Sequence, residues 1–261
     1  MRLSGLRKSR PSTEKPAAPS ADWFLKQFEE YYDPADNQIG PEGIEKLCSA
    51  LGVDPSDVLV LVLAWIMEAK QMGYITRDEW NKGAAALGAS TSLESLMDEL
   101  RAVYASARKN STQLRSLHRY THAFCREDRR KNIDAAVAIP MVTLLHGPSF
   151  PAHVPKICEF LEVRARAAAH AEARRGPRAP PAARAAAAAT ESACICMRAH
   201  VQTHDTAQKR GISADEWSML LNFFTEVKPD CSNYQDDGAW PLLLDDYVEW
   251  RRSEAGDAGG S

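Results

Sequence analysis

The sequence lacks the features that define several large classes of protein. No apolar run approaches the roughly 18–20 residues that span a bilayer, and residues 1–20 contain no apolar segment typical of a secretory signal. The formal net charge is −3, so bulk charge favours neither a nucleic-acid partner nor a membrane surface. Six cysteines are scattered through 261 residues, a chain too long to depend on disulfides, so we expect free thiols in a reducing compartment.

Motifs of catalysis and cofactor binding are also missing. The sequence contains no Walker loop, no dinucleotide-binding GxGxxG, no HExxH and no GxSxG. Two weaker metal candidates are His118 with His122, four residues apart on an expected helix, and Cys194-Ile-Cys196 with His200. Neither set is completed by a clear further ligand. We therefore expect no catalytic residue, no metal and no cofactor, and a binding or scaffold protein is favoured over a cysteine- or metal-dependent hydrolase.

Charge is distributed unevenly along the chain. Residues 1–20 carry five basic side chains against one acidic one, a net charge of +4, and we expect residues 1–22 to be a disordered basic tail. Residues 211–250 carry nine acids against one base, a net charge of −8, together with seven aromatic side chains. This segment is therefore expected to be folded, and its acidic face either meets a basic partner or is an ordinary solvated surface.

Residues 164–201 differ from the rest of the chain. They carry seven Arg, two Glu and no aromatic side chain, and prolines at 177, 180 and 181 interrupt any continuous helix. Such a segment has little apolar surface to bury, so we expect an unstructured insert. A splicing or gene-model artefact is the alternative. Residues 251–261 are expected to be a flexible tail.

Four segments repeat one pattern, an isoleucine followed by a helix start. Ile39 and Ile75 are 36 residues apart, and Ile133 and Ile212 are 79 apart, or 41 once the 38 residues of the insert are removed. Each isoleucine stands where an EF-hand-like helix–loop–helix unit, here called a hand, has the short extended residue that pairs with its neighbour. We predict an all-α fold of two helical lobes, each a pair of hands, over about residues 23–108 and 109–250.

The helix starts in these hands carry capping signals. Thr76 with Glu79, and Ser213 with Glu216, fit capping boxes, in which a hydroxyl and a carboxylate satisfy free N–H groups of the first turn. In the other two hands, Pro41 and Asp134 suit the corresponding places. Apolar spacing predicts a buried central helix at 57–69, and further helices at 23–31, 93–107, 114–125, 137–145, 154–163, 217–227 and 242–250.

The loops of the hands are poor calcium sites. A calcium loop needs oxygen ligands at positions 1, 3, 5 and 12 and a glycine at position 6. With the isoleucine at position 8, the fourth loop has Asp205 and Glu216 at its ends but Lys209 and Arg210 inside. We therefore expect Glu79 and Glu216 to act as caps. An EF-hand-like calcium sensor is kept as the alternative function.

The C-terminal run at 230–250, DCSNYQDDGAWPLLLDDYVEW, resembles the signature of the defective-in-cullin-neddylation family. Agreement covers about residues 23–250 without the insert, and extends through Tyr32-Asp-Pro, Ile39-Gly, Asp54-Pro, Leu63-Ala-Trp65 and Ile212…Asp215-Glu-Trp217. The resemblance implies a potentiating-neddylation domain of two EF-hand-like lobes without calcium.

The resemblance also implies a function, that of a non-catalytic co-ligase. Such a scaffold holds a cullin's C-terminal winged-helix subdomain beside the neddylation conjugating enzyme, within a ubiquitin ligase complex. The ubiquitin-like modifier then passes from the enzyme's cysteine to a cullin lysine, helped by proximity and orientation. A monomer in the cytoplasm and nucleus is expected, with no nucleic-acid or membrane partner.

Two binding sites are implied by the resemblance. The cullin patch of the family matches Asp215, Ala239 and Asp245, two carboxylates for basic cullin side chains and a small residue that permits close approach. A second site takes the N-acetylated methionine of the conjugating enzyme, whose missing terminal charge suits an apolar pocket. The matching positions are apolar and could equally be ordinary core: Ile44, Val60, Leu63, Ala64, Met67, Phe124 and Leu144.

The chain departs from the family in two respects. Many members carry an N-terminal ubiquitin-associated domain, and the roughly 20 residues before Trp23 leave no room for one, so a plant-like member without it is expected. The insert is not a usual family feature. It falls between two helices ahead of Asp215, where it could hinder the cullin patch.

Overall fold

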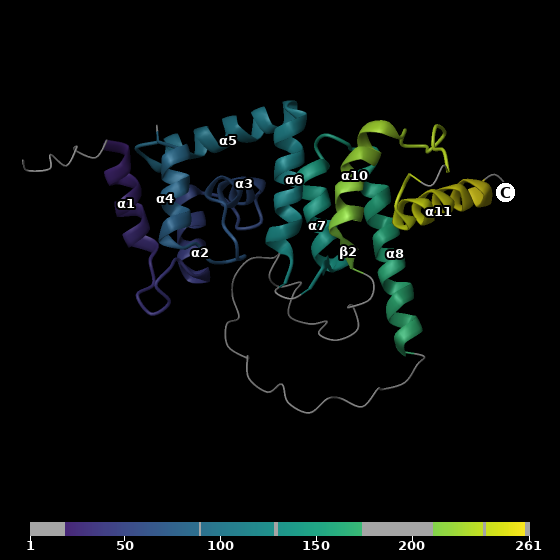
Figure 1. Cartoon of the computed structure of the whole chain (residues 1–261), viewed down its shortest axis with the longest axis horizontal. Helices are drawn as coiled ribbons and strands as arrows, with labels where there is room; N and C mark the ends of the chain where they lie inside the picture. The colour runs from purple at the N-terminus through teal and green to yellow at the C-terminus, as the bar shows by residue number, and fades with distance from the viewer. Residues whose placement is uncertain (1–18, 89, 128–129, 174–210, 237–238, 259–261) are drawn as a thin grey trace, which may run out of the picture.

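The computed structural model describes residues 19–88, 90–127, 130–173, 211–236 and 239–258, which form an all-α structure (Figure 1). Within these segments, no helix combines the length and apolar character needed to cross a membrane. The helices are α1 (Pro19–Tyr31), α2 (Pro41–Leu51), α3 (Val58–Met67), α4 (Arg77–Ala86), α5 (Leu93–Lys109), α6 (Ser111–Cys125), α7 (Ala135–His146), α8 (Val154–Ala173), α10 (Ala214–Glu226) and α11 (Leu242–Ala258). The two short strands are β1 (Asn132–Ile133) and β2 (Ile212–Ser213).

The hands pair through the four isoleucines. Ile39 and Ile75 exchange two backbone hydrogen bonds, each with an N···O distance of 2.9 Å. Ile133 pairs with Ile212 in the antiparallel β1–β2 ladder. All four side chains are buried, so each bridge joins two hands at the base of the core. The predicted pairing is confirmed.

Both predicted capping boxes form. Thr76 and Glu79 cap α4 reciprocally, and Ser213 and Glu216 cap α10 in the same way. In each case the hydroxyl accepts from the third helical N–H and the carboxylate accepts from the backbone N–H of the capping residue. The two hands therefore begin their second helices with the same device.

The structure corrects four expectations at helix ends. α1 begins at Pro19, inside the segment 1–22 that was expected to be a disordered tail. Asp134 precedes α7 but makes no capping bond, because its carboxylate pairs with Arg130 at 3.0 Å instead. α8 continues to Ala173, inside the segment expected to be an insert, because its alanines and arginines are good helix formers. α11 continues to Ala258, inside the segment expected to be a flexible tail. The expectations for residues 1–18 and 174–201 fall outside the described residues.

Helix α6 stands at the centre of the molecule. It packs on α3 and α5 on one side and on α7 and α10 on the other (Figure 1). Two buried tryptophans occupy matching places in the second and fourth hands, each five residues after the paired isoleucine. Trp80 donates its indole N–H to the Phe24 carbonyl at 2.8 Å, and Trp217 donates to the His118 carbonyl at 2.7 Å. One continuous core therefore runs through both lobes.

Candidate functional site

An apolar cavity lies between α2 and α3 of the first lobe and the ends of α6 and α7. It contains about 890 Å³ of empty space, counting the solvent at its mouth. Six of the seven positions that the sequence suggested are among its lining residues: Ile44, Val60, Leu63, Ala64, Phe124 and Leu144. Because Phe124 and Leu144 come from the second lobe, both lobes contribute to this one cavity.

Met67, the seventh suggested position, is not part of the lining. Its side chain is fully buried and packs on Gly83 of α4, where an added Cβ would come within 2.6 Å of the Met67 Cγ. The helix α3 is apolar nearly all round, so one of its faces lines the cavity and another fills the core. Sequence cannot separate these two faces, since both carry the same residue types.

The loop after α3 shapes one wall of the cavity. Ala69, Met72 and Gly73 line it, and Gly73 adopts a positive φ of 84°, a conformation that favours glycine. The Tyr120 hydroxyl donates to the Ala69 carbonyl at 2.9 Å, while its ring stacks on Phe124. Burial raises the pKa of Tyr120, so the hydroxyl stays protonated and continues to donate. The wall is therefore held from α6.

Two thiols lie in the cavity wall, those of Cys48 and Cys125. Both residues are buried, and burial raises the pKa of Cys125 to about 12, so its thiol is neutral at pH 7 and a poor nucleophile. Polar side chains among the lining residues are few and include Glu45 and Asp57, of which Asp57 caps α3 by accepting from the Leu59 N–H. Such a cavity suits an uncharged, apolar chain end, because an ammonium group would lose its hydration there.

The three residues suggested for the cullin patch lie at the starts of α10 and α11, which pack on each other. Asp215 is exposed in the first turn of α10, where a carboxylate is favoured by the helix dipole. Ala239 is exposed just ahead of α11. Asp245, half-buried in the first turn of α11, accepts a hydrogen bond from the Tyr234 hydroxyl. The sequence did not point to Tyr234 as a partner of Asp245. The one sequence signal for it is an aromatic residue within an acidic loop.

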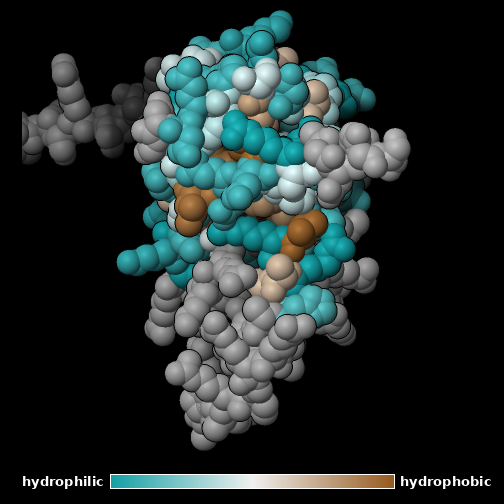
Figure 2. All heavy atoms as spheres, turned by 90° about the vertical axis from the view of Figure 1, so that its right-hand side faces the viewer, coloured by the Kyte–Doolittle hydropathy of each residue, from teal (hydrophilic) through white to brown (hydrophobic). Residues whose placement is uncertain are grey.

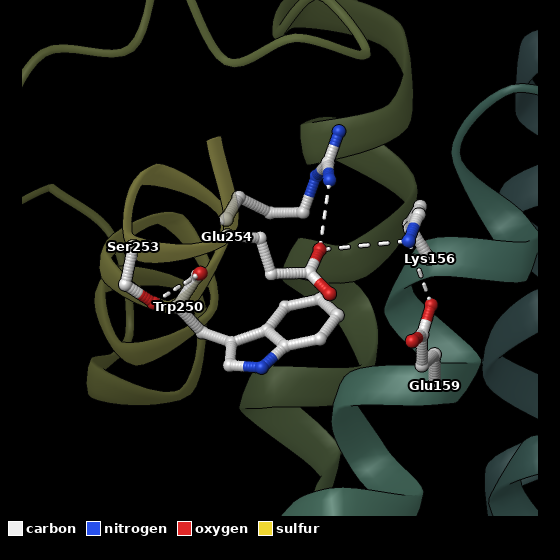
Figure 3. Close-up of polar contacts among 6 residues, drawn as sticks. Lys156, Glu159, Trp250, Ser253 and Glu254 are labelled. Carbon is white, nitrogen blue, oxygen red and sulfur yellow. Dashed lines mark hydrogen bonds and ion pairs between the residues drawn. The ribbon is translucent and has the colours of Figure 1, made fainter. Parts of the chain in front are cut away.

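An ion pair joins α11 to α8. The Lys156 ammonium lies 2.8 Å from the Glu159 carboxylate and 3.5 Å from that of Glu254, which also pairs with Arg251 at 3.0 Å (Figure 3). The Trp250 ring lies beside this cluster, 5.9 Å from the Lys156 ammonium (Figure 3). The Lys156–Glu254 pair gives the part of α11 beyond residue 250 a contact with α8.

The end of the molecule formed by α8, α10 and α11 is mainly hydrophilic, with hydrophobic side chains scattered over it (Figure 2). Leu242, the first residue of α11, is 70% exposed. Since it follows Ala239 by three residues and precedes Asp245 by three, it adds an apolar contact to an acidic surface. This combination suits a basic protein partner better than a small molecule.

The histidine pair that could have held a metal is occupied by hydrogen bonds. His118 bonds through Nε2 to the Trp217 carbonyl at 2.6 Å and through Nδ1 to His146 at 2.9 Å, and His122 bonds to the Ile212 carbonyl at 3.1 Å. In the described part of the chain, no group of three or more His, Cys, Asp or Glu side chains could hold a metal ion. The candidate at Cys194, Cys196 and His200 lies outside it.

Comparisons with known proteins identify the class to which this fold and surface belong. A family model described as cullin binding matches residues 190–250, the segment that carries Asp215, Ala239 and Asp245. The chain is 32% identical to DCN1-like protein 4 of Homo sapiens over 251 residues, 94% of this chain and 68% of that protein. It is 30% identical to DCN1-like protein 5 of Rattus norvegicus over 230 residues, 87% of this chain and 76% of that protein.

A third relative is DCN1-like protein 4 of Drosophila melanogaster, 28% identical over 228 residues, 86% of this chain and 73% of that protein. The chain belongs to the DCN1-like family, the defective-in-cullin-neddylation family that the C-terminal run resembles. The cullin-binding match and the relatives together support a role in the cullin neddylation pathway.

Proposed function

We propose that the protein is a scaffold-type co-ligase that promotes cullin neddylation. In this account it binds a cullin's winged-helix subdomain through the starts of α10 and α11, and the acetylated N-terminus of the conjugating enzyme through the apolar cavity. The observation that carries the proposal is that a cullin-binding match and an apolar cavity occur in one continuous fold. The two sites lie on different elements, the cavity mainly on α2, α3, α6 and α7 and the cullin surface on α10 and α11.

The charge and shape of the α10–α11 surface support the cullin side. Asp215 and Asp245 supply carboxylates for basic side chains, and the small Ala239 lets a partner approach the backbone closely. The Tyr234 hydroxyl orients Asp245 before a partner arrives, which lowers the entropy lost on binding.

The composition of the cavity supports the enzyme side. An N-acetylated methionine presents a thioether chain and an uncharged amide, whereas a free N-terminus presents an ammonium group. The apolar lining, which includes Val60, Leu63 and Phe124, accepts the acetylated methionine without burying an unpaired charge.

The mechanism of such a scaffold is positional. By holding the thioester-bearing enzyme and the acceptor lysine in one complex, it turns a bimolecular encounter into an effectively intramolecular one. The side chains described here supply no proton transfer to that step, and the buried neutral thiol of Cys125 is not a nucleophile for it.

No specific observation favours the calcium-sensor alternative. The two oxygens of the Glu79 carboxylate accept from the backbone amides of Lys70 and Thr76, and Glu68 pairs with Lys82 at 2.6 Å. The carboxylates of the second loop are therefore engaged within the fold.

The proposal is tested by a triple variant, Asp215→Ala with Ala239→Arg and Asp245→Ala. Removing a desolvated carboxylate costs roughly 2–5 kcal/mol of binding, and the arginine adds bulk and charge of the wrong sign. We expect loss of binding to the cullin winged-helix subdomain, with helicity and acetyl-peptide binding unchanged. Wild-type cullin affinity in this variant would refute the assignment of the surface.

A further inference from the structure

Four buried histidines lie around α10, and they fall into two groups. His118 and His122 of α6 lie at the N-terminal end of α10, and His146 of α7 joins them through its hydrogen bond to His118 while its ring packs on Phe224 further along α10. The exposed fractions of these three side chains are at most 4%. His153 lies at the other end of α10, where it bonds to the backbone of Val227 and packs on the rings of Phe223 and Phe224. Of these four residues, His118 and His122 contact Trp217 in the part of α10 that carries Asp215.

The first group forms a continuous chain of hydrogen bonds. A carbonyl oxygen can only accept, so His118 donates from Nε2 to Trp217, and its Nδ1 therefore accepts from Nε2 of His146. Trp217 returns a bond from its indole N–H to the His118 carbonyl, and the two rings stack with centroids 4.8 Å apart. His122 adds a bond to the carbonyl of Ile212 in β2. The residues on either side of the α10 capping box are thus held from α6.

This arrangement lies directly behind Asp215. Residues two apart on an α-helix point about 200° apart, so a fully buried Trp217 directs Asp215 to the opposite, solvent-facing side. The hydrogen bonds of His118, His122 and His146, here called the clamp, fix the backbone of this turn without touching the exposed surface. Any partner that binds the Asp215 carboxylate meets a first turn whose position has already been set.

We propose that His118, oriented by His146, is a positioning residue for Asp215 and thereby for cullin binding. The inference rests on the function proposed above for the α10–α11 surface. Its action is indirect, since neither histidine reaches the exposed face.

The clamp works in the neutral state of both rings. His122 and Arg115 act electrostatically on His118, His118 acts on His146, and Arg126 acts on His122. Each of these groups is cationic when charged, so each disfavours a proton on the histidine it acts on. Burial, with a smaller contribution from these charges, lowers the pKa of His118 to about 4 and that of His146 well below its usual value. A proton on Nδ1 of His118 would place two N–H donors against each other and open the chain of bonds.

The test uses one substitution at both ends of α10. His118→Phe keeps a ring to stack on Trp217 but removes both hydrogen bonds, whereas His153→Phe makes the same exchange at the far end and is the matched control. For each protein, calorimetry measures affinity for the cullin winged-helix subdomain and for an acetylated N-terminal peptide of the conjugating enzyme. Hydrogen exchange measures local opening of α10 at residues 216–219 and 223–227.

We expect His118→Phe to weaken cullin binding at least fivefold, leave peptide binding within twofold, and speed exchange at 216–219 at least tenfold. His153→Phe should leave cullin affinity within twofold and affect exchange mainly at 223–227. In the wild type, lowering the pH from 7 to 5 should open residues 216–219, after correction for intrinsic rates, and His118→Phe should reduce that pH dependence, with His122 and His146 accounting for what is left.

Equal cullin affinity in the wild type and His118→Phe, or equal losses in both variants, would overturn the positioning role. If His118→Phe fails to fold, His146→Phe tests the same point, because it keeps the bond to Trp217 and removes only the orienting donor. If the wild type binds no cullin, the proposed function fails, and the exchange pattern at 216–219 alone decides whether the clamp exists.

Discussion

At the scale of single residues, burial sets the chemical state of the reactive side chains. Cys125, His118 and His146 would be a nucleophile and two proton carriers on an exposed surface. In this fold all three are buried and neutral at pH 7, so they pack and donate hydrogen bonds. By contrast, Asp215 and Ala239 of the proposed cullin surface are exposed, so a partner protein can contact them directly.

Stability should therefore depend on the state of His118. Its pKa is about 4 in the folded chain and 6.5 when unfolded, so the unfolded state binds the extra proton first as the pH falls. The contribution of His118 to stability is complete above pH 7 and falls between pH 6.5 and 4, by about 2–3 kcal/mol. Urea unfolding at pH 7 and 4.5 measures the loss. His118→Phe should reduce it by that amount, and an identical loss in the variant would exclude His118 as the cause.

The cavity should discriminate between two forms of one peptide. Because its lining is apolar, we expect the acetylated N-terminal peptide of the conjugating enzyme to bind at least tenfold more tightly than the same peptide with a free amine. Calorimetry with both peptides makes the comparison, and Val60→Arg, which places a charge in the lining, should abolish binding of the acetylated form. Equal affinities for the two peptides would show that this cavity does not recognise the acetyl group.

At the scale of elements, the second and fourth hands share three structural features, but these features support different sites. Each has a paired isoleucine, a capping box and a buried tryptophan five residues after that isoleucine. In the second hand these parts support α4 and, through Gly73 and Ile75, the cavity wall. In the fourth they support α10 and the turn that carries Asp215.

This repetition supplies a matched pair of variants. Ser213→Ala and Thr76→Ala each remove one cap hydroxyl, so each should lower the free energy of unfolding by about 1 kcal/mol. Only Ser213→Ala loosens the turn of Asp215, so only it should weaken binding to the cullin winged-helix subdomain. Unfolding in urea and calorimetry measure the two effects. Weaker cullin binding by Thr76→Ala as well would mean that the loss follows general stability.

Local signals were readable from the sequence, and tertiary ones were not. The isoleucine pairs and the capping boxes of Thr76 and Ser213 depend on residues close in the chain, and both form as predicted. The part of α11 beyond residue 250 contacts Lys156 of α8, nearly 100 residues away, and spacing within the helix could not reveal this contact. For the same reason the burial of Met67 on Gly83, and the partnership of His118 with His146, emerge only from the fold.

At the scale of the whole molecule, α6 links the two proposed binding sites. Its C-terminal end contributes Phe124 and Cys125 to the cavity, while His118 and His122, nearer its middle, hold the start of α10. A single rigid helix thus fixes the cavity and the α10 surface relative to each other. For a scaffold this matters, because the rate enhancement comes from the relative placement of the two partners.

The bridging claim is tested most directly by a reconstituted cullin neddylation assay with two variants, each defective in one site. One is the triple variant at Asp215, Ala239 and Asp245, and the other is Val60→Arg in the cavity. If one molecule must hold both partners, each variant alone fails to stimulate modification, and an equimolar mixture of the two also fails, while the wild type succeeds. Restored stimulation in the mixture, or full stimulation by either variant alone, would contradict the account.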